Sequence, residues 1–216
     1  MITGSIEWGV AELPLAGQAE NGDGYVVQPF ADGVLVAAVD GLGHGREAAA
    51  AASIAAATLK ELPFEPLTAL FHRCHERLRH TRGVVMSVAW FQTGERTMAW
   101  LGVGNVEGVL QRGSPHGSPA SETLLVRSGL VGSHLPPLRA SVLSVNPGDT
   151  LIVATDGIRR GFAEEPLRAI RPRRAADRIL ARYARGTDDA LVLVARYLGG
   201  RLEREDPTRA CGAPTP

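Results

Sequence analysis

The stretch Leu-Val-Ala-Ala-Val-Asp-Gly-Leu-Gly-His-Gly occupies residues 35–45 and gives the strongest indication of how the chain folds. Its five consecutive apolar residues predict a buried β-strand. Asp40 follows that strand directly, and Gly41 allows the backbone to turn sharply. The same arrangement recurs at residues 151–157, Leu-Ile-Val-Ala-Thr-Asp-Gly, where Asp156 follows the strand. Two buried strands therefore each deliver a carboxylate to the end of a sheet.

Two further strands are expected to carry acidic residues at their beginnings. Asp23 lies in Asn-Gly-Asp-Gly at residues 21–24, and Asp188 lies in Thr-Asp-Asp at residues 187–189, each ahead of an apolar run. If the four strand ends meet at one edge, the carboxylates repel one another strongly unless divalent cations neutralise them. Oxygen ligands favour magnesium or manganese over zinc. A single Asp-Gly is most often a simple turn, so spacing alone leaves both a metal site and a set of turns open.

The periodicity of apolar residues predicts a chain dominated by strands, with helices at about 45–61, 65–80 and 173–185. Many strands follow one another without intervening helices, which indicates an α+β fold with mostly antiparallel sheets. We expect one domain over residues 1–198 and a polar, flexible tail over residues 199–216. The expected strands lie at about 5–12, 24–30, 33–39, 84–92, 97–102, 106–111, 122–127, 141–145, 150–154 and 190–197.

Composition excludes several classes of function. Of the 23 basic residues in this 216-residue chain, only Lys60 is a lysine, and no glycine lies near it, which excludes a P-loop nucleotide site and disfavours Schiff-base chemistry. The formal net charge of zero argues against generic nucleic-acid binding. Cys74 and Cys211 offer neither a zinc spacing nor a disulfide framework, and no apolar run is long enough for a bilayer. We therefore expect a cytoplasmic protein with no nucleic-acid partner and no membrane association.

Charges are distributed unevenly along the chain. Residues 1–58 contain seven acidic residues and one base, whereas residues 159–185 contain nine arginines and three acidic residues. The arginine-rich segment has two interpretations. It is either the solvated outer face of a helix or a docking surface for an acidic phosphoprotein, because it begins directly after the Asp156 motif.

Three other motifs have alternative interpretations. The loop at residues 40–45 resembles a dinucleotide-binding fingerprint but has the wrong glycine spacing. His72, His75 and Glu76 share a helix face and could bind a transition metal, but the pattern favours a solvated polar face, because the spacing is not that of a zincin motif. The sequence Gly-Val-Gly-Asn at residues 102–105 predicts a tight hairpin turn.

Four motifs, taken in order, resemble those of the metal-dependent protein phosphatases (PPM family). The resemblance is to the bacterial branch that includes SpoIIE, RsbU and RsbX, covers nearly the whole chain, and implies a four-layer αββα sandwich of two antiparallel sheets flanked by helices. The single-domain length, with no sensor module, favours a stand-alone stressosome phosphatase like RsbX. The motifs are Asn-Gly-Asp-Gly-Tyr at 21–25, Val-Asp-Gly-Leu-Gly-His-Gly at 39–45, Ala-Thr-Asp-Gly-Ile at 154–158 and Thr-Asp-Asp-Ala at 187–190.

The resemblance also implies a site with two divalent ions, Mn²⁺ or Mg²⁺. Asp40 would bridge the ions and the Gly41 carbonyl would bind one of them. Asp156 and Asp188 would hold the other ion, and Asp23 would bind directly or through water. Asp40, Asp156 and Asp188 are thus the expected catalytic residues. The two ions would lower the pKa of a shared water, and the resulting hydroxide would attack the phosphorus of phosphoserine or phosphothreonine in line.

The implied function is that of a cytoplasmic serine/threonine phosphoprotein phosphatase that resets a stressosome-like complex by dephosphorylating its STAS-domain proteins. A non-catalytic PPM-fold binding module in the same complex is the main alternative, although the intact acidic motifs argue against it. A metallohydrolase of small phosphoesters would need a deep pocket.

Some positions depart from the family pattern. Leu42 stands where eukaryotic relatives place a histidine, and no arginine precedes Arg46 to clamp the phosphate. The ions, or an arginine elsewhere, must therefore bind the phosphate. Asp189 falls where many relatives have Asn, which gives it a supporting role.

Overall fold

Two antiparallel β-sheets form the centre of the molecule. The computed structural model describes residues 1–114, 120–165 and 167–200. Sheet A has the strand order β1 (Ile2–Thr3), β2 (Ile6–Leu13), β12 (Ala190–Tyr197), β11 (Thr150–Ala154), β7 (Glu107–Gln111) and β8 (Ser121–Leu124). Sheet B has the order β10 (Ser141–Ser144), β6 (Thr97–Val103), β5 (Val84–Gln92), β4 (Gly33–Gly41) and β3 (Asp23–Phe30), and β9 (Val126–Arg127) pairs in parallel with β6.

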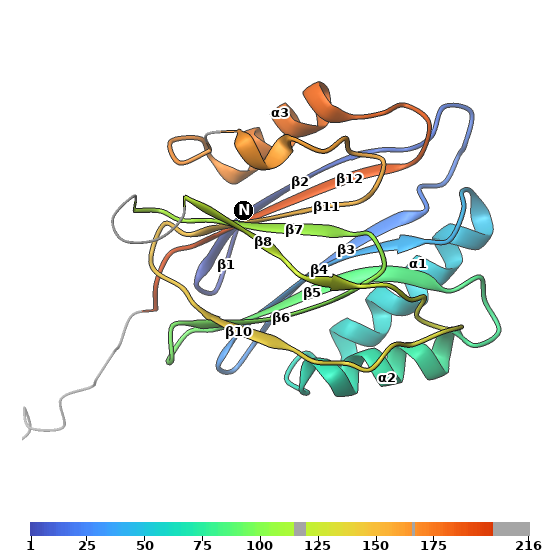
Figure 1. The fold of residues 1–216 in the computed structure, drawn as a ribbon, viewed down its shortest axis with the longest axis horizontal. Helices are drawn as coiled ribbons and strands as arrows, with labels where there is room; N and C mark the ends of the chain where they lie inside the picture. Colours follow the sequence, from blue (N-terminus) through green and yellow to red (C-terminus); the bar gives the residue numbers. More distant parts are fainter. Residues whose placement is uncertain (115–119, 166, 201–216) are drawn as a thin grey trace, which may run out of the picture.

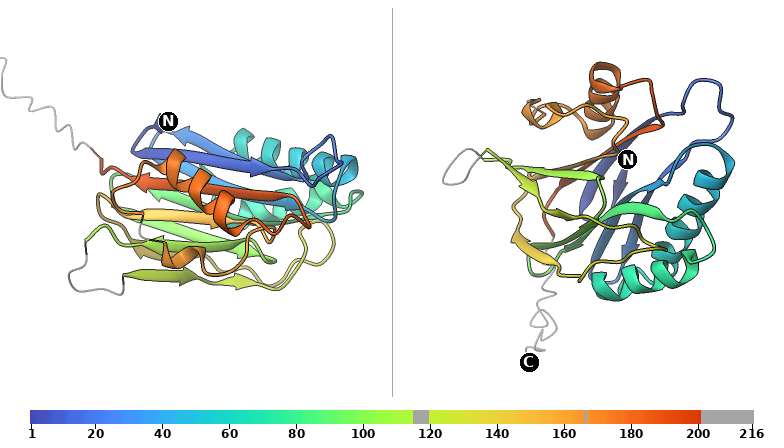
Figure 2. Two further views of the ribbon diagram at one scale, coloured as in Figure 1. Left: turned by 90° about the horizontal axis from the view of Figure 1, so that it is seen from above. Right: turned by 45° about the vertical axis from the view of Figure 1, so that its right-hand side comes forward.

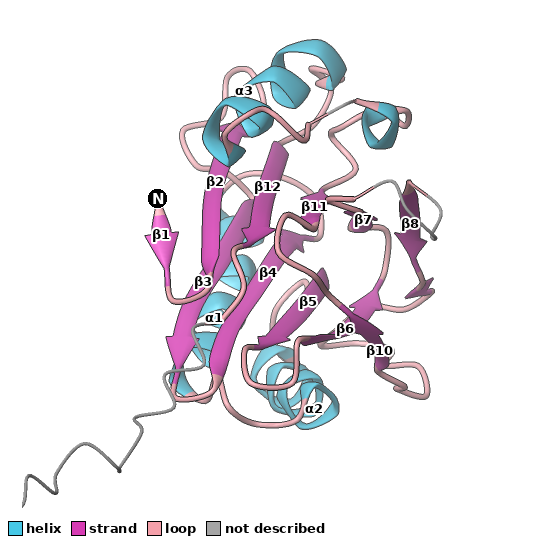
Figure 3. Cartoon of the chain, turned by 90° about the vertical axis from the view of Figure 1, so that its left-hand side faces the viewer, coloured by secondary structure: helices cyan, strands magenta, loops and turns pink. Residues whose placement is uncertain are grey.

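Helices cover the outer face of each sheet. Sheet B is covered by α1 (Arg46–Glu61) and α2 (Leu67–Leu78), and sheet A by α3 (Pro172–Tyr183) with the short 3₁₀ turn η1 (Phe162–Glu164). Figures 1 and 2 show the resulting order of layers, and Figure 3 shows α3 and the pair α1 and α2 on opposite sides of the two sheets. The expected four-layer αββα sandwich is confirmed. No helix in the described ranges is long and apolar enough to cross a bilayer.

The continuous apolar runs in the sequence are explained by burial on both faces of each sheet. Val36 and Ala38 of β4 point into the core between the sheets, whereas Leu35, Ala37 and Val39 pack under α1 and α2. Residues of β11 and β12 divide in the same way between the inter-sheet core and the face under α3. Alternate residues of a strand point to opposite faces, so a strand with two buried faces needs no polar residues along its length.

All three expected helices are present, within a few residues of the expected bounds, but two expectations for the strands are wrong. The segment 122–127 is not one strand, because β8 pairs with β7 in sheet A and β9 pairs with β6 in sheet B. The turn at residues 102–105 is not a hairpin, because it carries the chain from β6 in one sheet to β7 in the other. Residues 201–216 of the expected polar tail lie outside the described residues. The same is true of residues 115–119 in the stretch 113–121, whose Gly, Ser and Pro residues predict a polar loop.

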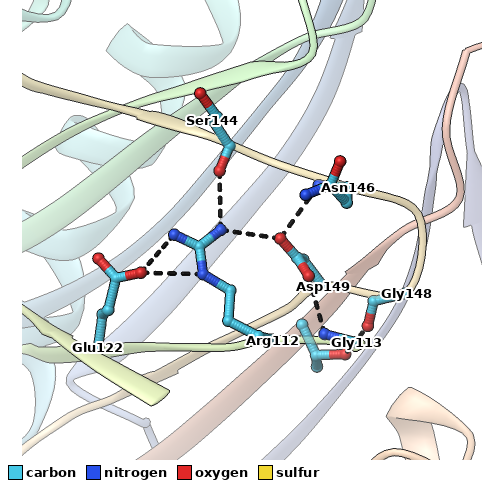
Figure 4. Close-up of polar contacts among 8 residues, drawn as sticks. Arg112, Gly113, Glu122, Ser144, Asn146, Gly148 and Asp149 are labelled. Atoms are coloured by element: carbon cyan, nitrogen blue, oxygen red, sulfur yellow. Dashed lines mark hydrogen bonds and ion pairs between the residues drawn. The ribbon is translucent and has the colours of Figure 1, made fainter. Parts of the chain in front are cut away.

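A partly buried ion-pair network connects strands at one end of the sandwich (Figure 4). The Arg112 guanidinium, just beyond β7, donates to Asp149 just before β11 at 2.9 Å and also pairs with Glu122 of β8. Asp149 additionally accepts backbone N–H groups of Gly113 at 2.8 Å and Asn146 at 3.0 Å. Since β7 and β11 are antiparallel, this end of the sheets lies opposite the end that holds Asp156.

Candidate metal centre

The inward-facing rows of four strands end in polar residues at the same end of the sandwich. On β3 and β4, Asp23 and Asp40 are direct cross-strand partners and continue the rows that face the inter-sheet core. On β11 and β12, the rows through Leu151 and Leu191 are continued by Thr155 and Asp189. Because the pattern of alternation is fixed along each strand, the apolar core gives way to a cluster of oxygen atoms here.

Three of the expected site residues line one cavity. Asp40, Asp156 and Asp188 border a space of about 420 Å³, so the structure brings three strand ends together as the motifs predicted. Asp23 is not among the residues that line this cavity; it is only 7% exposed and accepts a hydrogen bond from the Thr155 hydroxyl at 2.7 Å. The other residues along the cavity are Leu42, Gly43, Val85, Gly104, Asn105, Ser128 and Gly129.

The surroundings of the cluster disfavour negative charge. Burial, together with the neighbouring carboxylates of Asp23, Asp156, Asp188 and Asp189, raises the pKa of Asp40 to about 9. Burial likewise raises the pKa of Asp23 to about 7, against the opposing effect of the Thr155 hydrogen bond. The fold therefore gathers carboxyl groups where their ionised forms are costly, which is the electrostatic pattern of a functional site.

Asp189 has a structural role that the sequence only suggested. Its Oδ1 accepts the backbone N–H of Leu15 at 2.8 Å, and its Oδ2 accepts that of Gly22 at 2.9 Å. Both oxygens are thus occupied by the loop between β2 and β3, and the side chain is buried. Asp189 fixes the loop that leads to Asp23, which agrees with the supporting role expected for it.

Asn105 is the site residue that sequence reasoning missed. Its side-chain amide donates to Oδ2 of Asp156 at 2.7 Å, and it lines the same cavity. The sequence suggested only a turn here. The contact joins residues 51 positions apart and arises because the turn crosses between the sheets, so no local signal points to it. Thr155 did leave a signal, as the one polar residue at the end of an apolar run.

The two glycines of the Asp-Gly pairs are required by close packing rather than by a sharp turn. Neither Gly41 nor Gly157 has a positive φ. A Cβ at Gly41 would lie 2.2 Å from the carbonyl oxygen of Ala48 in α1, and a Cβ at Gly157 would lie 2.0 Å from that of Asp189. These approaches bring the start of α1 and the start of β12 against the residues that follow Asp40 and Asp156.

No histidine among the described residues lines the cavity. His44 is exposed and does not line it, whereas Leu42 is half exposed and does. On α2, Nδ1 of His75 accepts the backbone N–H of Gly132 at 3.0 Å, which anchors a loop and leaves the proposed transition-metal cluster on that helix without support. In the described ranges, no group of three or more His, Cys, Asp or Glu side chains is arranged as a ready metal site anywhere.

The donor set nevertheless fits a hard divalent cation. Magnesium keeps several of its waters and commonly takes only one or two carboxylates from a protein, so such a site needs fewer than three converging side chains. Within the described part of the chain, no Arg, Lys or His lies within ion-pair distance of Asp40, Asp156 or Asp188. Carboxylates gathered without cationic side chains, with oxygen as the only donor, suit magnesium or manganese.

Comparisons with known proteins agree with this arrangement. Residues 31–198 match the model of the Stage II sporulation protein E (SpoIIE) family. The phosphoserine phosphatase RsbX of Bacillus subtilis (strain 168) is 23% identical over 151 residues, which cover 69% of this chain and 73% of RsbX.

Two solved structures share the fold. A chain from a study of the bacterial stressosome, described as a modular system adapted to control secondary messenger signalling, is 28% identical, with a TM-score of 0.80 over 88% of this chain and 99% of its own. The crystal structure of RsbX in complex with magnesium is 20% identical, with a TM-score of 0.80 over 91% of this chain and 98% of its own. The chain therefore belongs to the Stage II sporulation protein E (SpoIIE) family, is similar in sequence and fold to the phosphoserine phosphatase RsbX, and shares the fold of PP2C phosphatase domains.

Proposed function

We propose that this chain is a cytoplasmic phosphatase that removes phosphate from phosphoserine or phosphothreonine in the STAS-domain proteins of a stressosome-like complex. One observation carries the proposal: Asp40, Asp156 and Asp188 come from three separate strand ends and line one cavity. The similarity to RsbX, a phosphoserine phosphatase, and to a chain from a bacterial stressosome study supports the substrate class.

The residues of the site would have different roles in binding the ions. Asp40, Asp156 and Asp188, with the carbonyl of Gly41, would hold two Mn²⁺ or Mg²⁺ ions, and Asp23 would assist beside them. When bound, such ions offset the negative charge of the phosphoryl oxygens and make water a stronger nucleophile at neutral pH. Asn105 fixes the carboxylate of Asp156 through its 2.7 Å hydrogen bond.

Apart from the carboxyl groups that would hold the ions, the cavity supplies no side-chain acid among the described residues. Among the described residues along its wall there is no His, Lys, Cys or Tyr, and Leu42 presents an apolar side chain at the position where eukaryotic relatives place a histidine. Solvent must therefore provide the proton that the departing serine or threonine oxygen takes up. The chain's contribution is to position the phosphoryl group and the carboxylates, which is the principal requirement in phosphoryl transfer.

Hydrolysis of p-nitrophenyl phosphate and of a phosphorylated STAS-domain protein tests the proposal. Both reactions should require manganese or magnesium and stop in chelator. Asp40→Asn and Asp156→Asn should each lower kcat by about 100-fold or more, on the scale of losing a metal-ligating or essential catalytic group. The matched control is Asp177→Asn, which removes an exposed carboxylate of α3 and should leave turnover unchanged.

The outcomes separate the candidate functions. Unchanged hydrolysis in the two site variants would exclude the metal-assisted mechanism. A wild-type protein that binds a phosphorylated STAS-domain protein but hydrolyses neither substrate would be a non-catalytic binding module. Hydrolysis of p-nitrophenyl phosphate without activity on any phosphoprotein would indicate a small-molecule phosphoesterase.

A further inference from the structure

The nine arginines between residues 159 and 185 differ in what they contact. Arg178 and Arg182 pair with the buried side chain of Glu165 at 3.1 and 2.5 Å, and the Tyr183 hydroxyl donates to the same carboxylate at 3.0 Å. The Arg159 guanidinium donates to the backbone carbonyl of Arg182 at 2.7 Å. These three arginines hold the segment after β11 against α3, so their role is structural.

Two other arginines border a second cavity beside the metal centre. Arg160 and Arg185 line a space of about 250 Å³ that is also lined by Asn105 and Asp156, the two residues it shares with the larger cavity. The two cavities are therefore adjacent, and a group bound in the larger one lies next to the space lined by the arginines. The remaining residues around it are Glu107, Thr155, Ile158 and Phe162.

Both arginines are available to an incoming anion. Arg160 is 88% exposed, and its only carboxylate partner in the described ranges is Glu107, at 3.4 Å from Nε to Oε1. Exposed pairs of this kind contribute little to stability, so a ligand can displace Glu107 easily. Arg185 is exposed and has no carboxylate within ion-pair distance among the residues that the structure describes.

The backbone holds the two arginines in fixed places. The N–H of Arg185 donates to the carbonyl of Gly157 at 2.8 Å, directly after Asp156. One step further, Ile158 forms a β-bridge with Ala184, and the N–H of Arg159 donates to the carbonyl of Tyr183 at 2.8 Å. The segments that carry Arg160 and Arg185 are therefore joined to each other and to the Asp156 turn.

We propose that Arg160 and Arg185 form a specificity site for an acidic residue next to the phosphorylated serine or threonine of a protein substrate. This inference rests on the proposed function, since it places the phosphorylated side chain in the cavity lined by Asp40, Asp156 and Asp188. The residue beside it in the substrate then meets the second cavity, whose volume suits one side chain. Arginine binds carboxylates through a planar fork of N–H donors, and two such groups favour Glu or Asp over a neutral residue.

The phosphoryl group is the other anion that two arginines could bind, and the test distinguishes it. Phosphoserine peptides that differ only in Glu or Gln at the neighbouring positions are compared with p-nitrophenyl phosphate, which has no neighbouring residue. Wild-type protein should favour the Glu peptides in kcat/KM. Arg160→Ala and Arg185→Ala should each lower kcat/KM by about three- to tenfold for the Glu peptides alone, with the Gln peptides and p-nitrophenyl phosphate unchanged.

Two further variants sharpen the comparison. Arg174→Ala removes the same charge from an exposed position on α3 that lines neither cavity, and it should have no effect. Glu107→Gln removes the competing carboxylate and should raise kcat/KM for the Glu peptides, which a merely structural role of Arg160 would not produce.

Peptide binding, measured in parallel by fluorescence anisotropy, separates this inference from the proposed function. Equal losses on all substrates would show that the arginines bind the phosphoryl group and would overturn the inference. The absence of any Glu preference in both turnover and binding would overturn it as well. A Glu preference in binding that disappears in Arg160→Ala and Arg185→Ala would uphold it even if no substrate were hydrolysed, in which case the proposed function alone would fail.

Discussion

Asp40 occupies a position that favours ligand binding over stability of the fold. Its folded-state pKa is raised to about 9, mainly by burial, whereas an unfolded Asp titrates near 3.8. Between these values the folded protein binds more protons than the unfolded chain, so its stability falls as the pH rises. The pKa of Asp23, raised to about 7, acts in the same direction. In chelator, the stabilising contribution of the protonated carboxyls is complete below about pH 4 and is lost as the pH approaches 9.

The first prediction is that Asp40→Asn stabilises the protein in chelator at pH 8. Each unit of pKa shift corresponds to about 1.4 kcal/mol, so the gain should be at least of that order. Thermal denaturation in chelator should show a melting temperature that falls between pH 5 and pH 8 in wild type and falls less in the variant. Added manganese should raise the melting temperature of wild type but not of Asp40→Asn. Identical pH profiles for the two proteins would contradict this account.

The second prediction concerns Asn105, which positions the carboxylate of Asp156. Asn105→Ala removes the 2.7 Å hydrogen bond while leaving the ligand atoms in place. Loss of such a supporting contact typically costs 10- to 100-fold in metal affinity or activity. The manganese concentration for half-maximal activity should rise by about tenfold or more, with the melting temperature in chelator unchanged. Asn146→Ala, at the opposite end of the sheets, is the control and should leave the manganese dependence as in wild type.

At the residue scale, the sequence predicted the site residues that follow or precede an apolar strand, and it missed the one that depends on a contact between distant parts of the chain. Asp23, Asp40, Asp156 and Asp188 could be singled out in the sequence because each stands beside a recognisable apolar strand, and three of them line one cavity. The different environment of Asp189 also follows from alternation, since residues 189, 191 and 193 share the inward face of β12. Asn105 could not be found, because its partner is 51 residues away and the approach depends on how the two sheets stack.

The third prediction, at the scale of elements, is that the glycine after each aspartate sets how closely the elements pack. Gly41→Ala would place a methyl group 2.2 Å from the Ala48 carbonyl, so the start of α1 must move away from the end of β4. Overpacking of this kind costs about 1–3 kcal/mol or more. Urea denaturation should show that loss, and the displacement of Asp40 should lower kcat as well. Gly94→Ala, where a Cβ meets nothing within 4 Å, should change neither quantity. Full activity in Gly41→Ala would contradict a packing role.

The helices and strands were predictable where their pattern of burial stays the same along their length. Strands with two buried faces gave unbroken apolar runs, and the helices on the outside of the sheets gave helical periodicity. The segment 122–127 was misjudged because periodicity does not reveal a change of sheet. Leu125, between β8 and β9, is largely exposed, and its carbonyl accepts the indole N–H of Trp100 at 3.1 Å. A tertiary contact divides this stretch, and no local pattern encodes it.

At the scale of the whole molecule, the two ends of the sandwich carry different kinds of charged groups: a cluster of carboxylates at one end and an ion pair at the other. One end gathers carboxylates around the cavity of Asp40, Asp156 and Asp188, without cationic partners in the described ranges. The other end pairs Asp149, which is 2% exposed, with Arg112. Among the arginines after Asp156, Arg178 and Arg182 pair with Glu165, whereas Arg160 and Arg185 border the second cavity. The formal net charge of zero does not reveal this arrangement, because it is a sum over the whole sequence and the two ends differ in charge.

The fourth prediction is that the far end of the sandwich governs stability and leaves catalysis unchanged. Asp149→Ala leaves the Arg112 guanidinium in a largely buried position with one fewer carboxylate, and it frees the N–H groups of Gly113 and Asn146. Each N–H group left without an acceptor costs about 1–3 kcal/mol, and the lost carboxylate partner of Arg112 adds to that cost. Urea denaturation should show that loss, whereas Asp177→Ala, which breaks an exposed pair on α3, should cost less than about 1 kcal/mol. Turnover per folded molecule and the manganese dependence should match wild type in both variants, because β7 and β11 carry Arg112 and Asp149 at the ends remote from Asn105 and Asp156. A variant that kept its stability but lost turnover would instead show that the two ends of the sandwich are coupled.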